Sequence, residues 1–169
     1  MSKEIEARKV TSFRRVINKL LQILARKEIF PGNFRARLHK MRGVQFDDVG
    51  SVFFGDNIII DGIYPKNVRI GKRCIITSGV KILTHFLDTD KLSDDDGYYF
   101  RFYQGKVVIE EDVFIGFNVV IAKPVTIGKG SIIGANSVIT KDVPPGSVMT
   151  GSPAKLMKQF NKIPCQPEE

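Results

Sequence analysis

The chain has 169 residues, enough for one domain with a sizeable core, and 43% of them are hydrophobic. Its net charge of +8 is concentrated at one end, because residues 1–43 hold 12 of the 26 basic residues and 3 of the 18 acidic ones. The remainder is nearly neutral, so the charge predicts no nucleic-acid partner. The two cysteines predict no disulfide framework, and the absence of a long apolar run argues against a signal peptide or membrane span.

Residues 4–28 are predicted to form an amphipathic helix, and Pro31-Gly32 ends it. Its apolar residues recur at helical spacing: Phe13, Val16, Ile17, Leu20, Leu21 and Leu24. A short second helix follows, on which His39 is interpreted as a solvated or capping residue. Two interpretations of residues 1–43 stay open. They cap the open end of a repeat fold, or the basic amphipathic helix contacts a membrane surface.

A six-residue period organises residues 44–150. Isoleucine returns at every sixth position in its clearest stretch: Ile109, Ile115, Ile121, Ile127, Ile133 and Ile139. The same period begins earlier, where Cys74 occupies a place expected to point into the core. β-Branched residues favour short strands, and glycine or asparagine favours corners. A chain that turns every six residues with the same residue inward winds into a three-sided prism of parallel strands.

Two segments depart from the period. Residues 86–106, rich in aspartate and aromatic side chains, are predicted to form an extruded loop, and such insertions in regular scaffolds are often functional. Residues 151–169 are predicted to form a short C-terminal helix and a tail.

The hexads, together with "ILTHFLD" before the loop and "GANS" at residues 134–137, resemble the hexapeptide-repeat acyltransferases, in particular the galactoside and maltose acetyltransferases. The resemblance covers roughly residues 41–160. It implies a mainly β fold, a left-handed parallel β-helix with a helical N-terminal cap. It also implies acetyl-CoA as cosubstrate, no metal, and a homotrimer whose sites lie between subunits.

The same resemblance assigns roles to individual residues. His85 matches the catalytic histidine, and an imidazole suits general-base chemistry near neutral pH. The backbone N–H of Phe117 is the candidate donor to the thioester oxygen. Coenzyme A is expected to contact Phe114, Ala135, Thr140, Lys141, Lys155 and Lys158. The acceptor is expected to contact Asp88, Tyr98 and Tyr99.

The sequence therefore predicts a cytoplasmic O-acetyltransferase, and attachment to the inner face of the membrane stays open. Its acceptor is predicted to be a sugar hydroxyl of a cell-surface polysaccharide or of its precursor. Two alternatives stay open: an antibiotic acetyltransferase of the same fold, and a non-catalytic β-helix scaffold. The three-histidine zinc site of γ-type carbonic anhydrases is excluded, because the chain has only two histidines.

Overall fold

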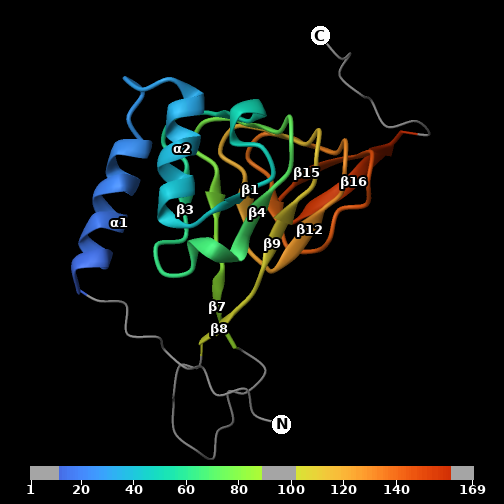
Figure 1. Ribbon diagram of the computed structural model, residues 1–169. Coiled ribbons are helices and arrows are strands. Elements are labelled where there is room, and N and C mark those ends of the chain that lie inside the picture. Colours follow the sequence, from blue (N-terminus) through green and yellow to red (C-terminus); the bar gives the residue numbers. More distant parts are fainter. Residues whose placement is uncertain (1–11, 89–101, 161–169) are drawn as a thin grey trace, which may run out of the picture.

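The protein is a three-sided parallel β-helix with two helices at its N-terminal end (Figure 1). The computed structural model describes residues 12–88 and 102–160. Successive coils contribute short strands to three sheets, and the coil strands pair in parallel with those of the next coil. The predicted prism of short parallel strands is confirmed.

The three sheets, named A, B and C here, are the sides of the prism. Sheet A contains β1 (Gln45–Phe46), β4 (Val68–Ile70), β9 (Val107–Ile109) and β12 (Val125–Ile127). Sheet B contains β2 (Phe53–Phe54), β5 (Ile75–Ile76), β10 (Phe114–Ile115), β13 (Ile132–Ile133), β15 (Ser147–Gly151) and β16 (Ala154–Gln159). Sheet C contains β3 (Ile59–Ile60), β6 (Lys81–Ile82), β11 (Val120–Ile121) and β14 (Val138–Ile139).

The isoleucines that set the period form the core. Ile115 pairs in register with Ile76 on one side and Ile133 on the other, and all three side chains are fully buried. In such aligned stacks each coil buries a large apolar side chain against those of the neighbouring coils. This burial supplies the hydrophobic stabilisation of the fold. Cys74 is also buried in this core, as predicted.

Two helices and two short 3-10 turns cover the first coils. They are α1 (Ser12–Ala25), α2 (Gly32–Arg42), η1 (Val49–Ser51) and η2 (Pro65–Asn67). The buried Arg35 of α2 donates to the Phe54 carbonyl at 3.1 and 2.7 Å, which fastens this helix to the first strand of sheet B. The predicted first helix ends at Ala25 rather than at residue 28, and residues 1–11 lie outside the described part.

The interruption of the period starts as a hairpin rather than as a loop. β7 (His85–Leu87) and β8 (Phe102–Gln104) pair antiparallel, with His85 opposite Gln104. The prediction that residues 86–106 leave regular structure entirely is therefore wrong at both ends, because backbone pairing between the two arms satisfies their polar groups. Residues 89–101 lie outside the described part. In Figure 1 the hairpin projects from the side of the coils.

The C-terminal segment is a strand, and the predicted helix is wrong. After the chain reverses at Gly151, with φ at +102°, β16 pairs antiparallel with β15. An α-helix here would leave the outer edge of β15 without partners, whereas the added strand satisfies that edge. Hydrogen bonding to the free edge of β15 therefore outweighs the helical propensity of this lysine-rich and leucine-containing segment.

Candidate active site

His85 begins the hairpin immediately after sheet C. Its side chain is 38% exposed, so the imidazole reaches the surface but is still partly covered by the protein. The Phe102 ring on the facing arm lies beside it, with ring centroids 6.3 Å apart, and is itself half exposed. The hairpin thus presents an imidazole and an aromatic face together.

A buried carboxylate holds His85 in place. His85 Nδ1 contacts Asp61 Oδ2, and the Asp61 side chain has no exposed surface. The backbone N–H of Thr84 also donates to Oδ2, at 3.1 Å, and that of Ile63 donates to Oδ1 at 2.7 Å. An ionised carboxylate only accepts hydrogen bonds, so Nδ1 carries the imidazole proton and Nε2 keeps its lone pair.

The charge state of Asp61 follows from the same contacts. Burial alone would raise the pKa of Asp61, but hydrogen bonds from the Ile63 N–H, the His85 ring and Thr84 together hold that pKa below its usual value. The carboxylate is therefore ionised at neutral pH. It orients the imidazole and stabilises the positive charge that the ring acquires on taking a proton.

Behind this pair, α2 braces the Asp61 corner with a buried polar network. Arg42 Nη2 donates to the carbonyls of Ile60 and Asp61, at 3.0 and 3.1 Å, and Nη1 donates to His39 Nδ1 at 2.9 Å. Burial lowers the pKa of Arg42 to about 10, and the charge of Asp61 opposes part of this effect. The guanidinium still carries its charge at neutral pH.

The interpretation of His39 as solvated or capping is wrong. The side chain is fully buried, and its ring lies 5.4 Å from that of Phe54. Burial, with the Arg42 charge as the smaller cause, lowers the pKa of His39 to about 3. His39 is thus a neutral acceptor that fixes Arg42, because α2 turns this side chain toward the first coil.

The candidate donor-side residues lie at a different corner, where sheet B turns into sheet C. The turns at Phe117 and Ala135 stack on consecutive coils, and the Asn136 N–H donates to the Phe117 carbonyl at 2.8 Å. Within residues 12–88 and 102–160, neither the Phe117 N–H nor the Ala135 N–H has a hydrogen-bond partner. Both residues are exposed, so these turns carry amide groups with unused donor capacity at the surface.

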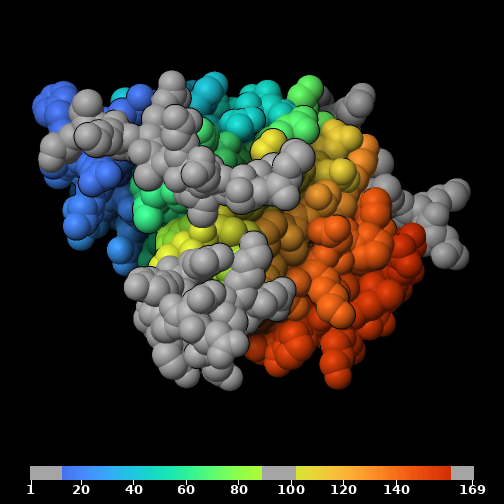
Figure 2. All heavy atoms as spheres, turned by 90° about the horizontal axis from the view of Figure 1, so that it is seen from below, coloured from blue at the N-terminus to red at the C-terminus, as the bar shows by residue number. Residues whose placement is uncertain are grey.

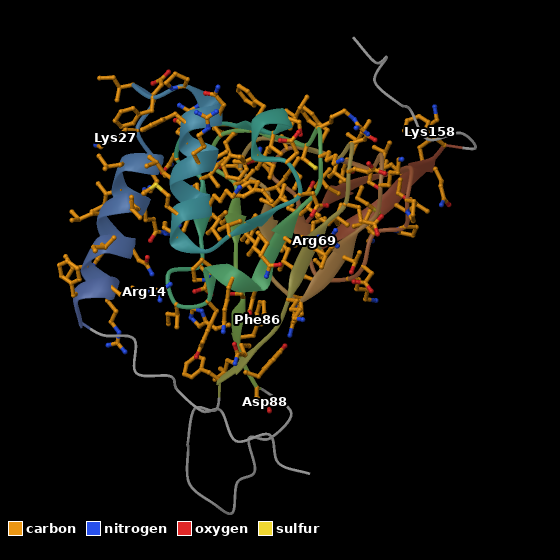
Figure 3. All side chains as sticks on the ribbon, in the orientation of Figure 1. Arg14, Lys27, Arg69, Phe86, Asp88 and Lys158 are labelled. Carbon is orange, nitrogen blue, oxygen red and sulfur yellow. The ribbon has the colours of Figure 1, made fainter. Side chains whose placement is uncertain are left out.

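The remaining donor-side residues are spread over the surface. Phe114 is 38% exposed on β10, just before the Phe117 turn. Lys155 and Lys158 are exposed on β16, and Lys158 lies 4.9 Å above the Phe160 ring. Figure 3 shows Lys158 on the opposite side of the molecule from the hairpin that carries Asp88.

One chain does not bring all predicted residues together. His85 lies at the corner where sheet C turns into sheet A, and Thr140 and Lys141 lie at the same corner two coils further on. The width of sheet C separates these residues from Phe117 and Ala135. Asp88 is half-buried at the end of the hairpin arm, whereas Tyr98 and Tyr99 lie outside the described part.

Asp61 is the residue that sequence reasoning missed. A register argument finds it: Ile60 pairs with Ile82 across one coil, so Asp61 sits at the start of the corner that His85 reaches one coil later. No group of three or more potential metal ligands occurs among the described residues.

Comparison with known proteins gives a family for the repeat region. Residues 106–141 match the family model described as bacterial transferase hexapeptide (six repeats). A 2,3,4,5-tetrahydropyridine-2,6-dicarboxylate N-acetyltransferase of Staphylococcus aureus (strain JH9) is 49% identical over 57 residues. That stretch is 34% of this chain and 24% of the relative, so the chain matches about a quarter of the length of such curated relatives.

Solved structures resemble the chain over most of its length. A maltose O-acetyltransferase from Clostridium difficile 630 has a TM-score of 0.67 at 23% identity, covering 92% of this chain and 90% of that one. A hexapeptide-repeat-containing acetyltransferase of Vibrio cholerae O1 biovar eltor, complexed with acetyl coenzyme A, has a TM-score of 0.63 at 24% identity. It covers 89% of this chain and 88% of that one.

A polySia-specific acetyltransferase is 31% identical, with a TM-score of 0.55, over 70% of this chain and 53% of that one. Family model and fold comparisons agree with the observed parallel coils. The resemblance seen in the sequence is thereby confirmed: the chain carries the bacterial transferase hexapeptide repeat on the left-handed parallel β-helix of the hexapeptide-repeat acyltransferases.

Proposed function

We propose that the protein is an acetyl-CoA-dependent O-acetyltransferase that acts on a sugar hydroxyl. The observation that carries the proposal is the contact between His85 and the buried, ionised Asp61. A surface imidazole whose Nδ1–H is committed to a carboxylate keeps Nε2 as a proton acceptor. The solved structure of the Vibrio cholerae relative with acetyl coenzyme A supports the choice of donor.

Each group of the chain would have its own role in the reaction. Acetyl-CoA supplies an acetyl group on a thioester. His85 Nε2 takes the hydroxyl proton as the new C–O bond forms, and returns it to the sulfur as the C–S bond breaks. The Phe117 N–H would donate to the carbonyl oxygen while that oxygen carries negative charge. Asp61 stabilises the imidazolium during the interval.

The acceptor proposal depends on the hairpin. Phe102 presents a half-exposed ring beside His85, and aromatic faces pack well against the apolar faces of sugars. The names of two relatives, one for maltose and one for polysialic acid, support a saccharide acceptor. An acceptor screen should offer hydroxyl and amino sugars side by side, because the Staphylococcus aureus relative is named as an N-acetyltransferase.

The first test is donor binding, measured by calorimetric titration of acetyl-CoA. We expect saturable binding that weakens at least about tenfold when Lys141, Lys155 and Lys158 are all replaced by alanine, since lysines pair with phosphates. Replacing three exposed basic residues away from both corners, Arg37, Lys40 and Lys72, is the matched control and should leave affinity unchanged. A folded wild type that does not bind acetyl-CoA would refute the proposal.

The separation of the two corners supports a homotrimer with sites between subunits. We expect His85→Ala and Ala135→Trp each to be inactive alone, because the first lacks the base and the second blocks the donor corner. Mixed trimers made by co-refolding should regain about a quarter of wild-type activity, from random pairing at each interface. Mixed trimers verified by mass spectrometry that stay inactive would place both halves of the site in one chain.

A further inference from the structure

Helix α1 does not pack on the body of the protein through its main apolar face, as a capping helix would. Its partly or fully buried side chains follow one stripe: Asn18, Leu21, Gln22 and Ala25. Gln22 Nε2 donates to the Ile60 carbonyl at 3.3 Å, next to the corner that carries Asp61. The helix is thus attached through a narrow and partly polar stripe, not through the apolar face that its sequence provides.

The apolar face of α1 is exposed instead. Six large apolar side chains lie 39–75% exposed along it: Phe13, Val16, Ile17, Leu20, Ile23 and Leu24. Figure 2 shows α1, in blue, at one edge of the molecule, away from the orange and red C-terminal coils. Contiguous apolar surface of this kind on an otherwise well-packed protein marks an interaction site.

The charge around this face indicates what covers it. Five basic residues and no acidic residue occur between Phe13 and Lys27, namely Arg14, Arg15, Lys19, Arg26 and Lys27. Figure 3 shows Arg14 and Lys27 at the two ends of the helix. A second copy of the same face would bring like charges together. The exposed Leu156–Met157 pair on β16 is equally unsuitable as a partner, because it is flanked by Lys155 and Lys158.

We propose that α1 lies flat on an anionic lipid bilayer, with its apolar face in the headgroup region and its basic side chains on lipid phosphates. An amphipathic helix with an exposed apolar stripe and basic flanks binds such interfaces. None of the helices among the described residues is long and apolar enough to cross a membrane. The contact is therefore peripheral.

Co-sedimentation of the full chain with vesicles tests this. We expect binding to phosphatidylcholine vesicles that contain about 30% phosphatidylglycerol, weak binding to phosphatidylcholine alone, and release by added salt. Arg15→Gln with Lys19→Gln should weaken binding roughly thirtyfold. Phe13→Ser with Leu20→Ser should weaken it at least about tenfold.

Matched controls separate the helix from general effects. Lys72→Gln with Lys123→Gln removes the same charge from the β-helix, and Met41→Ser removes an exposed apolar side chain from α2; both should bind as the wild type does. Equal binding to both vesicle types, no binding, or unchanged binding by the Phe13/Leu20 variant would overturn the proposal. The face would be assigned to a second copy of the chain instead if the wild type did not bind vesicles and the Phe13/Leu20 variant lost its oligomeric state in light scattering.

The vesicle test is independent of the transfer reaction. The Phe13/Leu20 variant should still bind acetyl-CoA in solution with wild-type affinity, because α1 packs against α2 and bonds to the first coil, whereas the candidate donor-side residues lie on later coils. Loss of vesicle binding with intact acetyl-CoA binding therefore reports on the helix alone.

Discussion

Replacing His85 by alanine is expected to lower kcat by roughly 10²–10⁴ while acetyl-CoA affinity stays near that of the wild type. The reason is geometric: the imidazole has one nitrogen committed to Asp61 and the other at the surface, and the donor-side residues that share its corner, Thr140 and Lys141, lie two coils away. Steady-state rates with saturating acetyl-CoA, together with calorimetric titration, separate the two effects.

Gln104 provides a matched control for His85. It lies directly opposite His85 in the hairpin and is exposed, so Gln104→Ala disturbs the same strand pair without removing the base. Its rate should remain close to that of the wild type. If His85→Ala lost acetyl-CoA binding in proportion to turnover, His85 would be a donor-binding residue and the general-base role would be wrong.

Asp61→Asn is the second change with a large expected effect, a fall in kcat of roughly 10²–10⁴. Asparagine has nearly the same shape, but with its oxygen accepting from the Ile63 N–H, its NH2 group takes the place of Oδ2 and donates to His85 Nδ1. The imidazole then adopts the other tautomer, in which Nε2 carries the proton and cannot accept one. As a positioning residue, Asp61 should affect kcat far more than the KM for acetyl-CoA.

The same substitution should change how stability depends on pH. Because the folded-state pKa of Asp61 is depressed, its carboxylate stabilises the fold above the unfolded value of about 3.9, and this contribution disappears as pH falls through the folded pKa. Melting temperatures of the wild type should therefore fall in acid, more steeply than those of Asp61→Asn. Parallel profiles would show that the native carboxylate is not ionised.

The fold could be predicted from the sequence because the hexad repeats the same physical requirement many times. Each isoleucine such as Ile115 must fill one inward position, and many copies of one signal outweigh irregular positions. The C-terminal strand β16 could not be predicted in this way, because its conformation depends on the free edge of β15 and not on its own residues.

The site was predictable only in part, for a related reason. His85 could be proposed from the sequence because it stands next to the break in the period, which is visible along the chain. Asp61 and Arg42 act through contacts that span 24 and 18 residues, and only the register of the coils brings them together. His39 was misread because helix periodicity describes which face is apolar and not which face the body covers.

The pairing of β6 with β11 continues the coil on both sides of the hairpin as if the intervening residues were absent. Closing a longer loop between such fixed ends costs only about 0.6 kcal/mol for each doubling of its length. The coil can therefore accept segments of different length at the point where the hairpin leaves it, without loss of the scaffold. Acceptor-binding segments could then be exchanged at this point, while the proposed base and the proposed donor corner stay unchanged.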